Sequence, residues 1–244
     1  MRPSARRPTT GGDTMDLIYL AIENDLAIHE RESQFWKSRG VDAIRVSSMT
    51  EGIALASKQQ FLYIGINADN IHYTSSLAIL RATTNDPIFM ATTNYTIQEQ
   101  TKATKLGADL FGQLGDTPDD NFDAVMTQIQ HLRSRLPLTL SFVKPIVYRN
   151  ILLSEDYRLA LLDDKEVDLT KNEFDLLYTL ASKRGWVFTF EKLYNLVWGG
   201  EYDKASIETI KNTVARLRKK IADTNDKYSI IESVRNVGFR CPAL

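Results

Sequence analysis

Short apolar runs alternate with longer stretches of helical spacing through the first half of the chain. The five runs are LIYLAI (17–22), DAIRV (42–46), FLYIGI (61–66), PIFMAT (87–92) and DLFGQL (109–114). Apolar strands separated by helices are typical of a parallel sheet that is covered on both faces. The pattern therefore predicts an α/β fold, a doubly wound (βα)5 parallel sheet, over residues 15–136.

The pattern changes after residue 136. The segment LPLTLSFVKPIV (136–147) holds two prolines and lacks a helical period, so we predict a linker over residues 137–146. Beyond it, NILLSEDYRLALLDDKEVDL (150–169) is typical of three short strands joined by turns. A second domain is therefore expected over residues 147–244.

Helices dominate the middle of this second domain. The first is expected to begin at Thr170, with Glu173 three residues later in capping-box spacing, and to stop at Gly185. Two further helices and a hairpin are predicted over residues 189–198, 206–221 and 228–241. The second domain is thus predicted to be of the α+β class.

Composition limits the partners. The 244 residues carry a net charge of −1 with 43% hydrophobic residues, as in a globular protein. No apolar run approaches the ~20 residues that a membrane-spanning helix needs, so no membrane partner is expected. The single cysteine, Cys241, excludes an internal disulfide framework, and we expect a cytoplasmic protein. Residues 1–14 are predicted to be a disordered leader or a tag, and a native start at Met1 or Met15 stays open.

The segment SIETIKNTVARLRKKI (206–221) combines an apolar stripe with a basic remainder. The apolar residues recur at spacings of three and four, so one face of this helix is predicted to be core. Between residues 204 and 220 there are six Lys or Arg and one acid, a local net charge of +5 in a chain of net charge −1. That asymmetry requires an explanation.

Three interpretations compete for this helix. A solvated helix usually carries more acids for i,i+4 pairing. A membrane-surface helix has a broad apolar face with aromatic residues, whereas this stripe is narrow and aliphatic. A helix that reads a DNA groove needs a packed inner face and a basic or small polar outer face. The helix alone leaves the plain surface helix and the DNA reader both open.

The surrounding motifs resemble one family. LTKNEFDLLYTLASKRGWVFTFEKLYNLVWG, IETIKNTVARLRKKI and IIESVRNVGFR occur in the order and spacing of the winged-helix domain of OmpR/PhoB-family response regulators. The resemblance covers roughly residues 145–244 and implies a winged helix-turn-helix whose third helix enters the major groove of DNA. It implies a sequence-specific transcriptional regulator that binds double-stranded DNA at promoter repeats.

Position in the motif assigns DNA-facing residues on the third helix. The resemblance implies that these face bases or nearby phosphates: Thr209, Lys211, Asn212, Thr213 and Arg216. Many family members carry an Arg-Thr pair at the start of this helix, and here Glu208 precedes Thr209. An acid there is expected to weaken phosphate attraction or to alter base preference.

Other positions of the motif are expected to contact the DNA backbone or the minor groove. The resemblance implies backbone contacts for Arg218, Lys219 and Lys220, and a minor-groove contact for Arg235 at the wing tip. Trp198 matches a position near the backbone, with packing at the helix end as an equally good alternative.

The N-terminal half resembles the receiver domain of the same family. A phosphorylated receiver needs acids for Mg²⁺ after the first strand and an Asp acceptor after the third. It also needs a hydroxyl after the fourth strand and a Lys after the fifth. Mg²⁺ and Lys offset the phosphoryl charge while the acceptor carboxylate attacks.

Two of these positions are altered here. Glu23 and Asn24 match the acidic site and Thr92 matches the hydroxyl, but Asn67 stands at the acceptor and Leu114 at the Lys. An amide cannot act as a carboxylate nucleophile, so we predict a degenerate receiver and a phosphorylation-independent regulator. Asp69, two residues after the acceptor position, is expected to point elsewhere.

The resemblance further implies a homodimer through roughly residues 96–136 and RNA polymerase as a second partner. No cofactor, metal or enzymatic activity is expected, because His29, His72 and His131 are scattered without catalytic or metal spacing. The alternative is a receiver-fold module for protein interaction or ligand sensing, in which the winged helix is secondary. The sequence leaves open the operator, the choice between activation and repression, and any controlling ligand.

Overall fold

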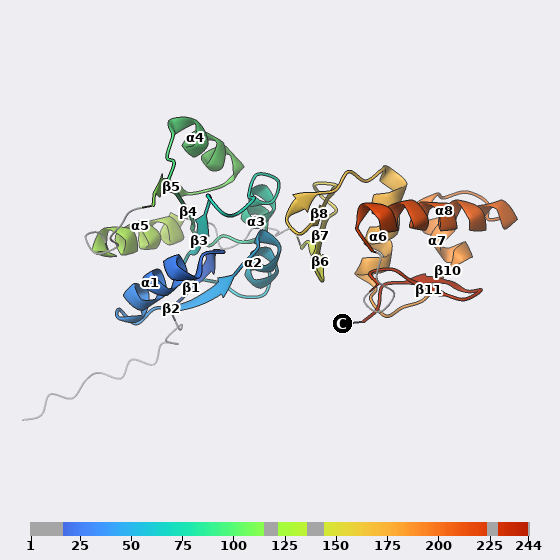
Figure 1. Ribbon diagram of the computed structural model, residues 1–244, viewed down its shortest axis with the longest axis horizontal. Helices are drawn as coiled ribbons and strands as arrows, with labels where there is room; N and C mark the ends of the chain where they lie inside the picture. The colour runs from blue at the N-terminus through green and yellow to red at the C-terminus, as the bar shows by residue number, and fades with distance from the viewer. Residues whose placement is uncertain (1–16, 115–121, 136–143, 224–228, 244) are drawn as a thin grey trace, which may run out of the picture.

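Five parallel strands form the N-terminal sheet of the computed structural model, which describes residues 17–114, 122–135, 144–223 and 229–243 (Figure 1). The strand order is β2-β1-β3-β4-β5. The strands are β1 (Ile18–Ile22), β2 (Asp42–Val46), β3 (Ile64–Asn67), β4 (Ile88–Thr92) and β5 (Leu110–Gln113). This arrangement confirms the predicted doubly wound sheet.

Helices cover both faces of this sheet because its central strands are apolar on both sides. In β1, Tyr19 and Ala21 pack in one core cluster with Trp36, while Leu20 and Ile22 pack in another with α2 and α3. The helices are α1 (Leu26–Lys37), α2 (Met49–Ala56), α3 (Leu77–Thr83), α4 (Ile97–Leu106) and α5 (Phe122–Arg135). The strict alternation along β1 fixes which helix lies on which face.

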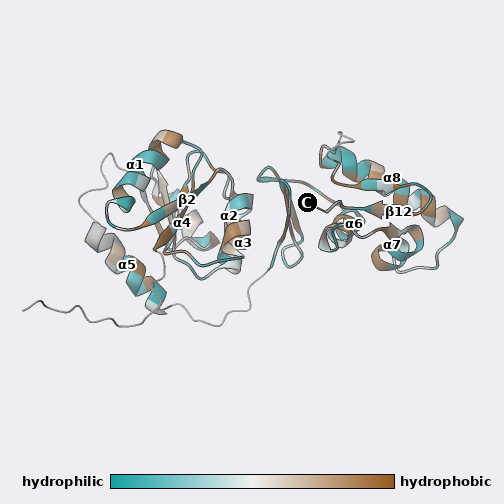
Figure 2. Cartoon of the chain, turned by 90° about the horizontal axis from the view of Figure 1, so that it is seen from below, coloured by the Kyte–Doolittle hydropathy of each residue, from teal (hydrophilic) through white to brown (hydrophobic). Residues whose placement is uncertain are grey.

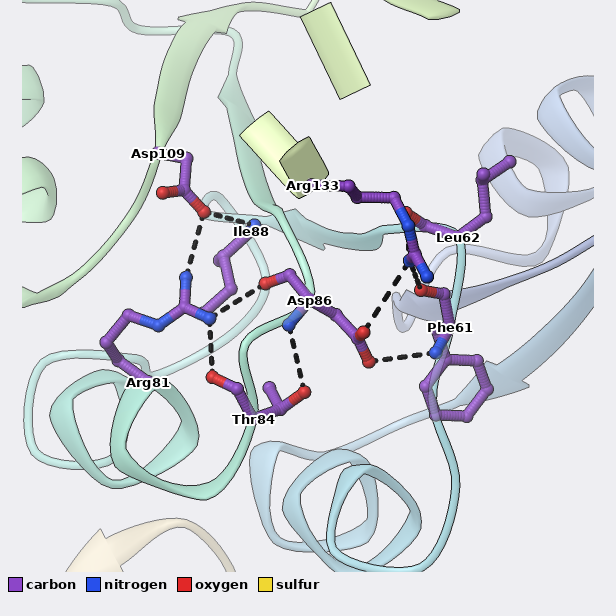
Figure 3. Close-up of polar contacts among 8 residues, drawn as sticks. All are labelled: Phe61, Leu62, Arg81, Thr84, Asp86, Ile88, Asp109 and Arg133. Atoms are coloured by element: carbon purple, nitrogen blue, oxygen red, sulfur yellow. Dashed lines mark hydrogen bonds and ion pairs between the residues drawn. The ribbon is translucent and has the colours of Figure 1, made fainter. Parts of the chain in front are cut away.

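A polar network holds the segments that enter the amino ends of β3, β4 and β5 (Figure 3). Arg133 of α5 donates from Nη1 to the Phe61 carbonyl oxygen at 2.6 Å and lies 3.7 Å from a carboxylate oxygen of buried Asp86. Asp86 in turn accepts from the Phe61 amide at 2.8 Å, and Arg81 pairs with Asp109 at 2.9 Å. These bonds anchor α5 and the segments that lead into β3, β4 and β5.

The C-terminal half is a four-stranded antiparallel sheet followed by three helices and a small three-stranded sheet. The first sheet has the order β6-β7-β8-β9, and the second has the order β10-β12-β11. The elements are β6 (Ile146–Tyr148), β7 (Ile151–Ser154), β8 (Leu159–Leu162), β9 (Lys165–Glu166), α6 (Lys171–Ser182), β10 (Phe188–Thr189), α7 (Phe190–Val197), α8 (Lys204–Lys220), β11 (Glu232–Val234) and β12 (Gly238–Arg240). Three helices followed by a β-hairpin make a winged helix, which confirms the predicted fold class.

The four-stranded sheet packs on both of its faces, between α2–α3 and α6 in Figure 1. Leu152 and Leu161 are fully buried in the N-terminal core cluster with residues of α2 and α3. Ile151 and Leu153, on the opposite face of β7, belong to the core cluster of the three C-terminal helices. One sheet therefore links both hydrophobic cores.

A carboxylate on this sheet caps a helix of the N-terminal domain. Asp164, in the turn between β8 and β9, accepts from the backbone amides of Met49 and Thr50 at 2.7 and 2.8 Å, and from the Thr50 hydroxyl at 2.7 Å. Ser48 accepts from the Glu51 amide at 3.2 Å. The unpaired backbone amides at the start of α2 are thus bound by Ser48 of the same domain and by Asp164 of the C-terminal domain.

The structure adjusts several predicted boundaries. Strand β6 begins at Ile146, one residue before the predicted start of the second domain, and the domain boundaries themselves stay predictions. Helix α8 begins at Lys204, two residues earlier than predicted. The predicted leader and most of the predicted linker lie outside the described residues. In the part of the chain that the structure describes, no helix combines the length and apolar character needed to cross a membrane.

Candidate nucleic-acid interface and acceptor-like pocket

Helix α8 has the predicted buried face. Ile210, Val214 and Leu217 are almost completely buried among the side chains of α6 and α7. Its start is fixed by a capping box in which Asp203 accepts from the Ser206 amide at 2.8 Å and Ser206 accepts from the Asp203 amide at 3.1 Å. The cap and the apolar stripe together set which side of the helix faces away from the domain.

The outward side of α8 is polar and basic, and hydrophilic colour runs along much of the helix in Figure 2. Its exposed residues are Lys204, Ala205, Glu208, Thr209, Lys211, Asn212, Ala215, Arg216, Lys219 and Lys220. A surface with cations, an amide and small residues can contact phosphates and base edges. The predicted residues Thr209, Lys211, Asn212, Arg216 and Lys219 therefore lie on one accessible surface.

Thr213 does not belong to that surface. Its side chain lies on the packed side of α8 with only 2% of the residue exposed, and its hydroxyl donates to the Thr209 carbonyl at 2.9 Å. It also accepts from Arg216 Nη2 at 3.2 Å. The predicted contact of Thr213 with DNA is therefore corrected. The Thr213 side chain is buried, and its hydroxyl holds the Arg216 guanidinium through a hydrogen bond.

Arg218 and Lys220 make bonds within the domain. Arg218 Nη2 donates to the Ile231 carbonyl at 2.6 Å and to the Ser233 hydroxyl at 3.1 Å, so it ties α8 to the segment that enters the wing. Lys220 Nζ lies 2.8 Å from both the Asp168 carbonyl and the Glu173 carboxylate. Their predicted backbone contacts stay untested, and the geometry assigns both residues a structural role in the free protein.

Glu173 is the buried acid behind this basic helix. It completes the predicted capping box with Thr170 and pairs with Lys220, while Arg216 Nε lies 3.6 Å from its other oxygen. Burial alone raises the pKa of Glu173, but the hydrogen bonds from Lys220 and Thr170 outweigh it and leave the pKa lowered. The carboxylate thus holds α6 and the C-terminal turns of α8 together.

The remaining predicted contacts lie at the two flanks of α8. Arg235 is exposed in the turn between β11 and β12, next to Asn236, whose positive φ of 60° suits a tight hairpin turn. Trp198 is half-buried against the C-terminal core and stacks on Tyr194 with ring centroids 5.6 Å apart. The geometry favours the packing alternative for Trp198, and Arg235 is exposed at the hairpin tip, where its minor-groove contact stays a prediction.

The acceptor-like pocket lies at the carboxyl ends of β1, β3 and β4. Asn67 is buried there, and its Nδ2 donates to Glu23 Oε2 at 2.6 Å. The other oxygen of Glu23 accepts from the Asp25 amide at 2.6 Å. Both oxygens of the predicted acidic-site residue are therefore engaged within the chain.

Asp69 reaches across to the end of β4. Its carboxylate accepts from the Thr92 hydroxyl and from the Thr93 amide, the latter at 2.8 Å. Burial raises the pKa of Asp69, but the bonds from Thr92 and Thr93 outweigh it, so the pKa is lowered and the ionised form is favoured. The expectation that Asp69 points away from the pocket is wrong, because these two donors draw it toward β4.

The other predicted pocket residues add no charge. Leu114 follows β5 and donates only its backbone amide to the Thr92 carbonyl at 2.7 Å. Asn24 is exposed and donates from Nδ2 to the Asn70 carbonyl at 3.1 Å. Among the described residues, no group of three or more His, Cys, Asp or Glu is arranged to hold a metal ion.

Comparison with known proteins identifies the C-terminal half first. A family model described as "Transcriptional regulatory protein, C terminal" matches residues 164–241. Regulatory protein VanR from Enterococcus faecium is 28% identical over 154 residues, which are 63% of this chain and 67% of that protein. DNA-binding response regulator MtrA from Mycobacterium tuberculosis is 22% identical over 230 residues, with 93% of this chain and 98% of that protein covered.

Residues 164–241 thus match a transcriptional regulatory domain, and the chain is similar over most of its length to response regulators. The family model is described as transcriptional regulatory, and VanR is named as a regulatory protein. A solved DNA-binding domain of RstA from Klebsiella pneumoniae, in complex with the RstA box, is 28% identical with a TM-score of 0.37, over 41% of this chain and 97% of that one.

Proposed function

We propose that this chain is a sequence-specific DNA-binding regulator of transcription that acts in the cytoplasm as a phosphorylation-independent dimer. The observation that carries the proposal is α8, whose inner face is core and whose outer face presents Asn212, Arg216 and Lys219 to solvent. Its placement beside a hairpin wing is that of a groove-reading helix. Full-length similarity to a protein named as a DNA-binding response regulator supports the same conclusion.

The outer face divides into two kinds of contact. Asn212 and Arg216 have side chains that pair with adenine and guanine edges, and Thr209 can donate or accept. Lys211, Lys219 and the wing residue Arg235 supply charge for phosphates or for the minor groove, which gives affinity without sequence preference. RNA polymerase is a further proposed partner of DNA-bound copies, through the loop at residues 199–205.

The dimer surface is proposed to be α4 and β5. Strand β5 is an edge strand, and exposed apolar side chains lie around it: Ile97 is 72% exposed, Tyr95 38% and Leu110 37%. An apolar group on an open sheet edge is a typical site of self-association. These exposed apolar residues support the described part of segment 96–136 as the proposed dimer surface.

The proposed independence from phosphorylation is supported by the contacts at the acceptor position. Asn67 lacks a nucleophilic carboxylate, and its amide nitrogen donates a hydrogen bond to the Glu23 carboxylate. The hydroxyl of Thr92 and the amide of Thr93, two donors that would bind an added anion, are already bound to Asp69. The chain thus supplies its own anion at this edge, the usual acceptor position holds an amide, and the donors that would bind a phosphoryl group are engaged by Asp69.

DNA binding is tested by a mobility-shift assay on the region upstream of the protein's own gene. Arg216→Ala should weaken binding by about tenfold or more, because a good base contact contributes about 1–3 kcal/mol. Arg31→Ala, which removes the same charge from an exposed position of α1, should bind as the parent does. Equal loss in both variants, or no binding by the folded parent protein, would refute the DNA-binding proposal.

The other two parts have separate tests. Incubation with acetyl phosphate and Mg²⁺ should add no phosphoryl mass to the intact protein, and a stable adduct would refute phosphorylation independence. Light scattering should find a dimer that Ile97→Glu converts to a monomer. Leu26→Glu, at an exposed leucine on α1, should leave the dimer intact.

A second candidate function, ligand sensing, is favoured by one cavity. About 460 Å³ of space lies between the domains, lined by polar residues that include Asn24, His72 and Arg149. A small polar molecule bound there would contact both domains at once. Calorimetric titration with a panel of polar metabolites tests this candidate, and saturable heat from one of them would support it.

A further inference from the structure

An acid stands on the outward face of the groove-reading helix, near its start. Glu208 and Leu217 are nine residues apart, which at 100° per residue places them on opposite sides of α8, and Leu217 is fully buried. The Glu208 side chain is 67% exposed. Asn212 and Lys219 lie on the same outward line, so Glu208 is positioned to enter whatever groove this helix enters.

An acid at this position needs a donor as its partner. A carboxylate has only acceptor atoms, so phosphates repel it and backbone contact is excluded as its role. In the major groove, guanine presents two acceptors and thymine presents an acceptor and a methyl group. Adenine has a donor, but its N7 acceptor lies beside it, whereas cytosine presents the N4 amino donor without an acceptor.

We propose that Glu208 is a specificity-determining residue that accepts a hydrogen bond from the N4 amino group of a cytosine in each half-site. The inference rests on the proposed DNA-binding function and names a base that the site selects. Lys211 Nζ lies 3.0 Å from Glu208 Oε1, so the ion pair engages one carboxylate oxygen and restrains the side chain on the outward face. The pair also lowers the repulsion between the acid and flanking phosphates.

A plain surface ion pair is the competing explanation. An i,i+3 Glu–Lys pair on a helix adds a little helix stability and has no effect on base preference. The two explanations differ in what happens when the charge is removed without loss of shape. Glu208→Gln keeps the side-chain volume and one acceptor but replaces the other acceptor with an amino donor.

The experiment is selection of binding sites from random duplex DNA by the full-length protein, at one fixed salt concentration. The parent protein should select cytosine at one position of each half-site by about tenfold or more over other bases. Glu208→Gln should reduce that preference to about threefold or less and leave the other positions of the motif unchanged. Glu201→Gln, which removes an exposed acid from the loop before α8, should select the parent motif.

The outcomes separate this inference from the proposed function. A motif that Glu208→Gln leaves unchanged at every position overturns the role of Glu208 while DNA binding stands. Equal change at all positions also overturns it, because a base contact acts on one position. Failure of the folded parent protein to select any motif overturns the proposed function and this inference together. Circular-dichroism melting of Glu208→Gln should give the melting temperature of the parent, so that a loss of base preference is not due to unfolding.

Discussion

Asp164 offers a sharp test of how the two domains are joined, because it caps a helix in the domain to which it does not belong. The chosen change is Asp164→Asn. Residue 164 has a φ of 61°, a left-handed conformation that Asn tolerates and Ala does not, so the turn itself is preserved. Asn keeps one carboxyl-like oxygen and replaces the other with an amino donor.

The magnitude follows from the bonds that are lost. Asp164 Oδ2 accepts from the Met49 amide, and Oδ1 accepts from the amide and hydroxyl of Thr50. An Asn can satisfy one of these two oxygen positions, so one amide at the start of α2 loses its partner and faces a donor. Loss of a helix cap costs about 0.5–2 kcal/mol and loss of a charge-assisted bond about 1.5–3 kcal/mol. We expect a net cost of about 1–2 kcal/mol for opening the start of α2.

Amide hydrogen exchange measures this directly. The Met49 and Thr50 amides should exchange about five to thirty times faster in Asp164→Asn, since about 1.4 kcal/mol corresponds to a factor of ten. Asp163→Asn is the matched control, because Asp163 also has a positive φ and bonds to Asn150 within its own sheet. Unchanged exchange in Asp164→Asn, or equal acceleration in both variants, would refute the inter-domain cap.

Three further changes test the packing around the two candidate sites. Glu173→Gln should lower the free energy of unfolding by about 1–3 kcal/mol at neutral pH. Because the folded pKa of Glu173 is below the ordinary 4.5, this difference should be constant above that pH and should shrink as the pH falls through the folded pKa. Glu191→Gln, at an exposed first-turn acid of α7, should show neither effect in urea titrations at several pH values. Arg133→Gln should release α5 from the Phe61 carbonyl and further increase the pKa of Asp86, which burial already raises, in an NMR titration; an unchanged Asp86 pKa would contradict the network of Figure 3. Gly238→Ala should lower the melting temperature, with a cost of at least about 2 kcal/mol, because φ is 159° and a Cβ there would lie 1.9 Å from the Phe188 carbonyl oxygen. The melting temperature of Gly112→Ala, where a Cβ would meet nothing within 4 Å, should stay near that of the parent.

The sequence was sufficient wherever the determining contacts are local. The spacing of Ile210, Val214 and Leu217 predicted the buried face of α8, and Thr170 with Glu173 predicted the start of α6. The start of α8 was placed two residues late, because its cap uses Ser206 in place of the Glu or Gln of the usual capping box. The helical period and the common capping boxes can thus be recognised in the sequence, whereas the less common Asp203–Ser206 box was missed.

Thr213 shows a different kind of error. It is three residues after Ile210 and four before Leu217, so helical geometry alone places it on the buried side. The family resemblance led to its assignment as a DNA contact, although the spacing in this chain argued against it. A motif position therefore needs to agree with the helical period before a contact is assigned to it.

Contacts between distant segments could not be predicted. Asp69 and Thr92 are 23 residues apart, and Asp164 and Thr50 are 114 residues apart. Each bond depends on where two separate elements are brought by the fold, and neither leaves a periodic signal in the sequence. The closure of the acceptor-like pocket and the cap between the domains are therefore findings of the structure.

The position of α8 limits how its binding can be controlled. In Figure 1, α8 runs along the C-terminal domain from beside α6 outward, away from the N-terminal domain. The Thr92 hydroxyl and the Thr93 amide already bind Asp69, in line with the proposed independence from phosphorylation. The proposed dimer then provides the control, because tethering makes the second half-site contact intramolecular and raises affinity by about 10²–10⁴. If so, Ile97→Glu should weaken binding to a duplex with two half-sites by about 10² or more, yet bind a single half-site as the parent does. Fluorescence anisotropy on the two duplexes measures both affinities. A proportional loss on both would show that Ile97 acts on the DNA-binding domain itself and would contradict control by dimerisation.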